Sequence, residues 1–426
     1  MAYRHRGMAP PPAPADRTSV RRFVRHLFSL LTIVLAFTGG WTHARLAVAC
    51  LLADAGDAAR WRIAVRLAPE DARLQLRYAQ SGFSPGERAF EEALRTAPRW
   101  AQAHLAYAAW LDGEGRGQEA ERRYLEASSL DAGMRPRFAL ANYYYRAGNQ
   151  AAFLEWSKRA AAVPRANLEG IFALAERATP DVAAALREIL PPQPEAWRQC
   201  LDYYLRRQQW RTVRWVADRL APEARREDTG RLLWYADFEL LFGDPRLSLQ
   251  VWNRLVGAGG TPGPPLSPAA GPWLANPSWE AAPTHRAFDW RIREEEGASV
   301  TIAGRPRALR LELSGKQPPG GDFVQQFVYL TPARRYRFSL EARAEGLGEP
   351  SGLAWVALDG RTGAPLAELP LATTGWKTHH LDFRCPALQP LVRLALRYAR
   401  PPGWPRAAGW AEFRELSLAE SGGTGR

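Results

Sequence analysis

The sequence has few cysteines, and this scarcity narrows the kinds of site that the chain can build. The three that occur, Cys50, Cys200 and Cys385, are odd in number and far apart. A disulfide framework needs paired cysteines, and a zinc site needs Cys and His at short spacing, so this set supplies neither. We therefore expect buried free thiols that behave as small apolar side chains, and no cofactor.

Lysine is also scarce, and it supplies three of the 57 basic residues, at Lys158, Lys316 and Lys377. The formal charge of +13 is spread along the chain, with about +5 in residues 1–26, about +4 in residues 27–272 and about +4 in the remainder. A nucleic-acid-binding face gathers basic residues in one patch or stripe. The sequence therefore predicts no nucleic-acid partner, and its arginine content indicates a compositional bias.

Common catalytic signatures are missing as well. The sequence has no H-E-x-x-H zinc motif, no G-x-x-x-x-G-K-[ST] phosphate loop and no C-x-x-C pair. The acidic run Glu294–Glu296 and the neighbouring His379 and His380 have no nucleophile or relay partner beside them. We expect that the protein is not an enzyme.

The chain has one long uncharged apolar run, Leu27–Thr42. No residue between Arg25 and Arg45 carries a fixed charge, and that window just reaches the roughly 20 residues that span a bilayer core. Residues 1–26 form a basic tail, and positive charge is retained on the cytoplasmic side. We predict a single-pass transmembrane anchor at residues 27–42 in a bacterial inner membrane. The disordered N-terminal tail is then cytoplasmic, and the bulk of the chain is periplasmic.

Three alternatives for this run stay open. It could be a signal peptide cleaved after Ala44, because its apolar core has a suitable length. It could be a lipoprotein signal, in which Leu46–Ala49 precede the modified Cys50. It could also be a buried helix of a soluble domain, although the arginine flank and the lack of helical periodicity disfavour this reading.

Residues 44–256 are rich in Ala, Leu, Arg and aromatics and contain an internal repeat. An aromatic residue is followed three positions later by alanine at Trp61, Phe90 and Tyr124, and the last two lie 34 residues apart. We expect these aromatics, and Trp156 in a further copy, to lie in the core between helices. The pattern predicts helix pairs at 102–111 with 120–131, 135–147 with 150–162, 167–177 with 181–190, 194–208 with 211–220, and 228–242 with 245–256.

This region resembles tetratricopeptide repeats. The match is best in Ala120–Asp131, where Ala120, Tyr124 and Ala127 give the small–aromatic–small spacing of the second helix of a repeat. The resemblance implies an α-solenoid whose concave surface binds a peptide or protein partner, and such stacks rarely contain catalytic residues.

A Gly/Pro-rich stretch, Gly257–Pro272, is predicted to be an exposed linker between domains. Beyond it the hydrophobic period changes to two, which indicates short strands. The predicted strands are 308–313, 335–343, 353–359, 376–383, 392–398 and 410–418. Residues 273–420 should therefore form an antiparallel β-sandwich, and residues 421–426 a disordered tail.

The start of this region, Asn276-Pro277-Ser278-Trp279-Glu280, resembles the opening of jelly-roll domains of the galactose-binding and carbohydrate-binding-module type. The resemblance implies that a first strand carrying this motif lies beside the last strand, 411–418. It also implies a structural calcium held by Glu280 and Glu415, since hard cations bind carboxylate oxygens. A glycan would need exposed aromatic rings with polar groups beside them, and the candidates are Trp355, Trp376, Trp404 and Arg397.

These observations predict a non-enzymatic, membrane-anchored scaffold that binds protein partners in envelope assembly. The combination of anchor, repeats and sandwich resembles bacterial proteins associated with exopolysaccharide production or export, which implies a role in exopolysaccharide assembly. One alternative is a glycan-binding protein that uses the β-sandwich to hold a polysaccharide. Another is an accessory subunit of a membrane glycosyltransferase or polymerase.

Overall fold

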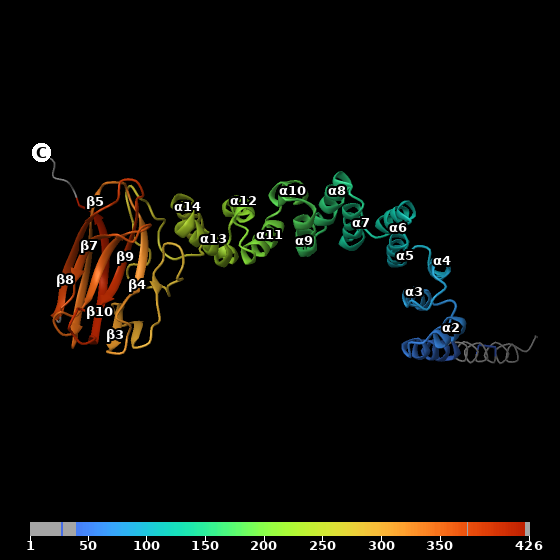
Figure 1. The fold of residues 1–426 in the computed structure, drawn as a ribbon, viewed down its shortest axis with the longest axis horizontal. Coiled ribbons are helices and arrows are strands. Elements are labelled where there is room, and N and C mark those ends of the chain that lie inside the picture. Colours follow the sequence, from blue (N-terminus) through green and yellow to red (C-terminus); the bar gives the residue numbers. More distant parts are fainter. Residues whose placement is uncertain (1–26, 29–39, 373, 422–426) are drawn as a thin grey trace, which may run out of the picture. The chain divides into compact units, whose positions relative to one another are not determined.

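The computed structural model describes residues 27–28, 40–372 and 374–421. The chain divides into two compact units, which we call unit 1 (residues 1–163) and unit 2 (residues 164–426) and describe separately. Unit 1 is helical, and unit 2 contains further helices followed by a β-sandwich (Figure 1). Most of the predicted anchor, residues 29–39, lies outside the described residues. None of the helices formed by the described residues combines the length and the apolar character that a membrane crossing requires.

Unit 1 is built from short helices that pack on their neighbours in the chain. Residues 40–54 are helical. They are followed by α2 (Ala58–Leu67), α3 (Ala72–Gln80), α4 (Glu87–Thr96), α5 (Ala101–Gly113), α6 (Gly117–Leu130), α7 (Met134–Arg146) and α8 (Gln150–Ala161). Helix α5 packs closely on α6, and α7 on α8, as the sequence predicts.

The predicted aromatic–alanine repeat forms the seam between these helices. Trp61, Phe90 and Tyr124 are buried, at 2–5% exposure. Each ring lies against an aromatic ring of the next helix, with centroid separations of 5.4–5.8 Å for the pairs Trp61–Tyr78, Phe90–Tyr107 and Tyr124–Tyr143. The alanine one turn later is fully buried in all three helices, so the neighbouring backbone can approach closely. One seam therefore recurs three times, and the prediction is confirmed.

The next copy departs from this rule. The sequence predicts Trp156 of α8 as the core aromatic, but Phe153, one turn earlier, is fully buried and Trp156 is only half-buried. The guanidinium of Arg159 lies 4.6 Å from the centre of the Trp156 ring and shields it from water. A large indole with a polar edge is suited to such a boundary position, so the smaller phenyl ring occupies the core.

The helices of unit 2 follow the predicted pairs. They are α9 (Glu169–Ala178), α10 (Val182–Ile189), α11 (Pro194–Arg206), α12 (Trp210–Leu220), α13 (Thr229–Phe242) and α14 (Pro245–Gly257). Asp181 and Asp244 cap α10 and α14 by accepting a backbone N–H of the first turn. Proline at the first position of α11 and α14 has no N–H of its own and so removes one of the unpaired donors of the first turn.

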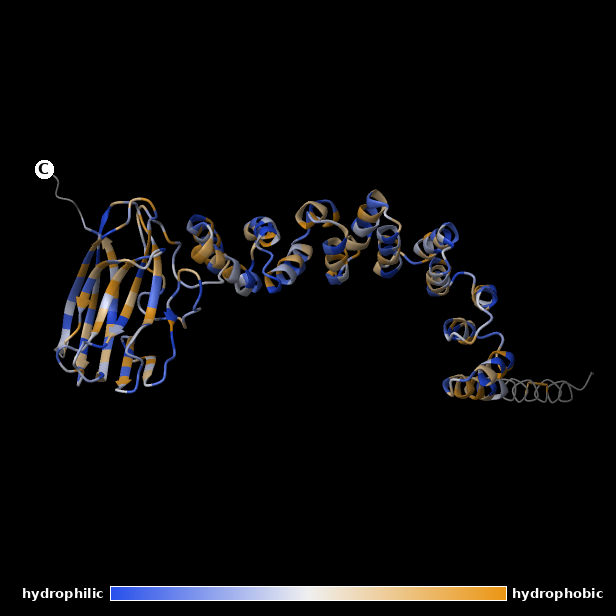
Figure 2. Cartoon of the chain, in the orientation of Figure 1, coloured by the Kyte–Doolittle hydropathy of each residue, from blue (hydrophilic) through white to orange (hydrophobic). Residues whose placement is uncertain are grey.

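The β-sandwich consists of two five-stranded antiparallel sheets. Sheet I has the order β1-β4-β9-β6-β7 and sheet II the order β2-β3-β10-β5-β8. The strands are β1 (Arg291–Ile292), β2 (Ala298–Ala303), β3 (Ala308–Ser314), β4 (Gly320–Tyr329), β5 (Arg335–Glu345), β6 (Leu353–Asp359), β7 (Pro365–Pro370), β8 (Thr374–Arg384), β9 (Leu391–Ala399) and β10 (Ala408–Glu420). Hydrophobic and hydrophilic residues alternate along many of them (Figure 2), and the core lies between the sheets.

All six predicted strands are confirmed, whereas β1, β2, β4 and β7 were not predicted. The burial of β4 does not alternate, because several consecutive residues near its end, such as Phe327 and Val328, are buried. A strand covered on both faces loses the period of two that identifies strands in sequence.

The expected first strand is wrong. Asn276–Glu280 is not a strand, because Asn276 and Trp279 have positive φ angles of 46° and 57°, which break an extended backbone. The Asn276 side chain instead bridges to both backbone groups of Ala281, at 2.7 and 3.2 Å. The neighbours of β10 are β3 and β5. The motif therefore forms a turn rather than the partner of the last strand.

The Gly257–Pro272 stretch is also not a free spacer. The Asn253 side chain of α14 accepts the N–H of Leu266 and donates to its carbonyl, both at 2.8 Å. The hydroxyl of Thr331 donates to the carbonyl of Pro268 at 2.9 Å. Leu266 is buried, at 6% exposure. The stretch is attached to the last helix at one end and to the sandwich at the other, so it joins them as packed coil.

Candidate functional site

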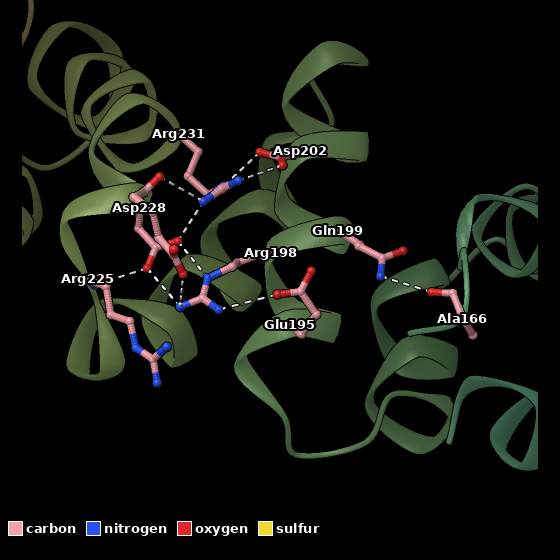
Figure 3. Close-up of polar contacts among 9 residues, drawn as sticks. Ala166, Glu195, Arg198, Gln199, Asp202, Arg225, Asp228 and Arg231 are labelled. Carbon is pink, nitrogen blue, oxygen red and sulfur yellow. Dashed lines mark hydrogen bonds and ion pairs between the residues drawn. The ribbon is translucent and has the colours of Figure 1, made fainter. Parts of the chain in front are cut away.

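A cluster of charged side chains lies in the interior of unit 2, where α11 meets the start of α13 (Figure 3). The fully buried Asp228 accepts hydrogen bonds from Arg198 Nε at 2.8 Å and Arg231 Nη1 at 2.6 Å. The backbone N–H of Arg225 also donates to it, at 2.9 Å. Arg231 then donates to both carboxylate oxygens of Asp202 on α11, at 2.8 and 2.9 Å. Two arginines and two aspartates thus fasten α11 to α13.

The protonation state of this cluster indicates a structural role. Burial alone would raise the pKa of Asp228, but the hydrogen bonds from Arg198, Arg225 and Arg231 outweigh burial and hold its pKa below the ordinary value. Asp228 is therefore ionised at neutral pH and has its acceptor sites filled. A general base needs a free site facing the substrate, and this carboxylate has its partners inside the protein.

The solvent-facing side of α13 carries aromatic residues at helical spacing. We call Trp234, Phe238 and Phe242 the aromatic face of α13. Trp234 is 37% exposed and Phe242 is 76% exposed. The ring of Phe238 stacks on that of Trp210 with 3.5 Å between centroids and 4° between planes. Sequence analysis placed α13 correctly but did not single out these residues, because a lone sequence does not say which apolar stripe of a helix is covered.

Two contacts hold the β-sandwich on the end of α13. Asp237 of α13 accepts the backbone N–H of Ala287 at 2.8 Å and a hydrogen bond from Arg291. Arg361, in the turn between β6 and β7, donates to the carbonyls of Leu241 and Gly243 at the C-terminal end of α13. These carbonyls have no partner within the helix, so Arg361 completes the helix end and fixes the sandwich to it.

The predicted glycan residues do not form one face. Trp355 is fully buried, and its ring lies edge-on to Trp290, Phe338 and Phe413 in the core. It offers no ring face to a sugar, and we correct it to a core residue. The reason is that β6 is covered on both sides, so each of its side chains faces protein.

The other candidates lie on different parts of the sandwich. Trp376 is on β8 of sheet II, and the guanidiniums of Arg343 and Arg414 lie 4.9 and 4.0 Å from its ring centre. Arg397 is on β9 of sheet I, where it pairs with Asp322. Trp404 is 48% exposed in the loop before β10. The structure therefore does not bring these residues together.

The expected calcium ligands are both exposed to solvent. Glu280 is an exposed residue of the turn described above, and Glu415 is an exposed residue at a register shift in β10. Among the described residues, no three His, Cys, Asp or Glu side chains gather closely enough to hold a metal ion. Calcium binding at Glu280 and Glu415 remains a sequence-based prediction.

One motif in unit 1 has the spacing of a serine nucleophile. Gly82-Phe83-Ser84-Pro85-Gly86 matches G-x-S-x-G, which in hydrolases joins a strand to a helix. Here it joins α3 to α4, and the hydroxyl of Ser84 donates to the carbonyl of Ala79 at 3.2 Å. The motif is therefore a turn between two helices.

The cysteines are free thiols, in agreement with the sequence analysis. Cys200 and Cys385 are buried, and Cys50 is half-buried. Burial raises the pKa of Cys200, and it raises the pKa of Cys385 to about 12. Because the thiolate is the reactive form, these two thiols are inert at neutral pH.

No protein-family model matches the chain, and no curated protein matches its sequence. Parts of the chain are similar to solved structures. A structure described as CBM4 is 16% identical over 35% of this chain and 99% of its own, with a TM-score of 0.28. PilF of Pseudomonas aeruginosa is 17% identical over 51% and 91%, with a TM-score of 0.26. YrrB, described as a TPR protein with an unusual peptide-binding site, is 18% identical over 39% and 93%, with a TM-score of 0.25. The assignment of a helical repeat array followed by a β-sandwich rests on the chain's own helix pairs and strand register.

Proposed function

We propose that this protein is a non-catalytic scaffold that binds protein partners through its helical array. The observation that carries the proposal is the repeated seam, in which each helix pair buries its aromatic and alanine residues against the next helix. The outer faces of the pairs within each unit are then left to solvent, and such faces are what repeat arrays offer to a partner. In unit 2 the sandwich, held on α13 by Asp237 and Arg361, is a second body beside the helices.

We further propose that residues 27–42 anchor this scaffold in a bacterial inner membrane, with residues 1–26 in the cytoplasm. The proposal is supported by the arginine-rich flank and by the uncharged window between Arg25 and Arg45. The scaffold would then act on the periplasmic side, in envelope or exopolysaccharide assembly. An alkaline phosphatase fused to the C-terminus in a bacterial host should be active, and a green fluorescent protein at the same point should be dark. The opposite result would exclude this topology.

Partner binding can be tested in the intact protein by site-specific photo-crosslinking in cells. A photoreactive residue would replace Leu125 of α6 or Arg206 of α11, which are both exposed, and Trp404 of the sandwich would serve as the control position. We expect discrete protein adducts from the two array positions, identified by mass spectrometry. If adducts form only at position 404, or at none of the three, the array is not the binding surface.

A further inference from the structure

Strand β2 forms one edge of sheet II, and it lacks the features that normally keep an edge strand from pairing further. Among the described residues, the strand that pairs with it is β3. The backbone groups along the outer side of an edge strand are a template for another strand, and natural edges block it with charged side chains, prolines, bulges or short length. The segment Ala298–Ala303 has no charged residue and no proline, and its register with β3 runs without a shift.

The other edge strands of the sandwich each carry such a feature. Strand β1 is very short and consists of Arg291–Ile292. Strand β7 begins and ends with proline, and its register with β6 contains a shift. Strand β8 carries the charged residues Lys377, Asp382 and Arg384. The unprotected edge at β2 is therefore an exception within this domain.

The backbone groups of β2 that are open to a further strand follow from its bonds to β3. The N–H of Ser314 at the end of β3 donates to the carbonyl of Gly297 at 2.9 Å. In an antiparallel pair, residues that bond to the partner strand alternate with residues whose N–H and C=O groups point away from it. Counting from Gly297, Val300 and Ile302 therefore point both backbone groups away from β3.

The side chains of β2 also leave room for a neighbouring strand. Val300 and Ile302 pack on the core between the sheets but are only half-buried. Ser299 and Thr301 alternate with them and are exposed on the outer face of sheet II. A strand beside β2 would cover the two aliphatic side chains further, and on the outer face it would meet small hydroxyl residues.

We infer that two copies of this protein join through antiparallel pairing of their β2 strands. A two-fold contact brings the same patch of both copies together, so a strand that carries charge of one sign would repel itself. Strand β2 carries no charge and so meets this requirement. The inference goes beyond the proposed function, because it does not depend on what the helical array binds. A dimer would present two arrays to a partner, which raises the avidity of binding.

The structure also fixes the register of this pairing. Ala298 points outward like Val300, but its N–H already donates to the carbonyl of Glu295 at 3.1 Å, so the contact is centred beyond it. Val300 then lies opposite Ile302 of the second copy, and the two residues exchange both backbone hydrogen bonds. Thr301 lies opposite Thr301 of the second copy, on the two-fold axis.

Disulfide crosslinking of the purified full-length protein in detergent micelles tests this register. Opposite residues that do not exchange hydrogen bonds have Cα atoms about 4.5 Å apart, which a disulfide can span. Thr301→Cys should therefore form a dimer under mild oxidation, and a reductant should return it to monomer. The matched control is Thr378→Cys, an exposed threonine on β8 at the other edge of sheet II, which should stay monomeric. Both variants carry Cys50→Ser, because Cys50 is only half-buried.

Charge substitutions at the same position test the two-fold symmetry. Thr301→Lys and Thr301→Glu should each raise the dissociation constant of the dimer about tenfold or more in sedimentation equilibrium, because like charges meet at the axis. An equimolar mixture of the two variants should restore the dimer through a Lys–Glu pair, which also shows that both variants are folded. Thr378→Lys places the same charge on the opposite edge and should leave the dissociation constant unchanged.

Several results would overturn the inference. These are a Thr301→Cys protein that stays monomeric, equal crosslinking of Thr378→Cys, or a dimer that Thr301→Lys and Thr301→Glu leave intact. A mixture of the two charged variants that stays monomeric would overturn it as well. None of these measurements involves the helical array. If crosslinking at positions 125 and 206 succeeds while the β2 tests fail, the scaffold function stands and only the β2 dimer falls.

Discussion

The helical array of unit 2 and the β-sandwich both contain arginine–aspartate pairs, but the pair in the array is buried and the pair in the sandwich is exposed. In the array, Asp228 is fully buried and is bound by Arg198 and Arg231 between α11 and α13. In the sandwich, Arg337 of β5 and Asp382 of β8 form a two-bond pair at 2.8 and 2.9 Å on the outer face, with both side chains about half exposed. The bond lengths match, so burial is the variable that differs.

This difference shows where each part obtains its specificity. The sandwich fills its core with large rings such as Trp279, Trp290 and Trp355. Its fully buried carboxylate, Asp289, is bound by the backbone N–H groups of Thr284 and Trp290. The helices of the array are short, and a buried charge between them is stable only when its partner on the next helix is correctly placed. The cluster at Asp228 thereby selects one arrangement of α11 and α13, and so positions the aromatic face.

Asp228→Asn should have the largest effect. The substitution keeps the shape but removes the charge, so Arg198 is left largely buried with only Glu195 and Glu227 as ionic partners. Breaking a buried pair costs about 3–5 kcal/mol, and we expect about 3 kcal/mol because those two partners remain. The measurement is urea unfolding of the full-length protein followed by tryptophan fluorescence.

The matched control is Asp382→Asn on the sandwich. An exposed pair contributes about 0.2–1 kcal/mol, because water screens it and two long side chains lose freedom in forming it. If the two variants lose equal stability, burial does not separate the two regions and the comparison fails.

The contribution of Asp228 should also depend on pH. Its pKa in the folded protein is below the ordinary Asp value of 3.8, so the folded state favours the ionised form. The stabilisation is therefore complete above pH values near 3.8 and is lost as the pH falls through the lower folded-state pKa. The difference in unfolding midpoint between wild type and Asp228→Asn should be constant from pH 7 to pH 5 and shrink in acid. A difference that grows as the pH falls would show that folding raises the pKa of Asp228 rather than lowering it.

Asp237→Ala should loosen the sandwich from α13. It removes the acceptor for Ala287 N–H and the ionic partner of Arg291. Burial lowers the pKa of Arg291, and Asp237 offsets part of that lowering. We expect a loss of about 2 kcal/mol at this junction, less than for a fully buried pair because both groups keep some exposure. Hydrogen exchange should rise in residues 281–292 and stay unchanged in α9 and α10. Equal exchange in wild type and variant would mean that Asp237 does not hold the junction.

Much of the fold could be predicted because helices and half-buried strands have regular hydrophobic periods. The predicted helix pairs from 102–111 to 245–256 are all present, and so are the six predicted strands. Two of the failures occur where burial does not follow a period, whereas β2 was missed although its burial alternates. Strand β4 is covered on both faces, and the Gly257–Pro272 coil is held by side chains such as Asn253 and Thr331 that composition does not single out.

The candidate sites were harder to predict than the fold. Trp355 and Trp404 are both tryptophans of the sandwich, yet the first is fully buried and the second is 48% exposed. Strand alternation assigns a residue to one of two faces but does not say whether the second face is also covered. The aromatic face of α13 was not predicted for the same reason. Its spacing is visible in the sequence, but its exposure depends on what packs beside it.

The smallest effect should come from the outer face of sheet II, where arginines lie against tryptophans. Arg343 is 4.9 Å from the centre of the Trp376 ring and 5.2 Å from that of Trp410, and it pairs with Glu412. Arg343→Met keeps an apolar stem over the rings but removes the charge, and Glu412 keeps its bond to Arg310. We expect a loss of about 0.5–1 kcal/mol, the value of a cation–π contact at a partly exposed site. Arg337→Met, which removes an exposed pair without a ring, is the control. A loss near 3 kcal/mol for Arg343→Met would mean that a guanidinium stacked on this face contributes as much to the free energy of unfolding as the buried cluster at Asp228. Stacking on an aromatic ring would then stabilise an arginine pair as much as burial does.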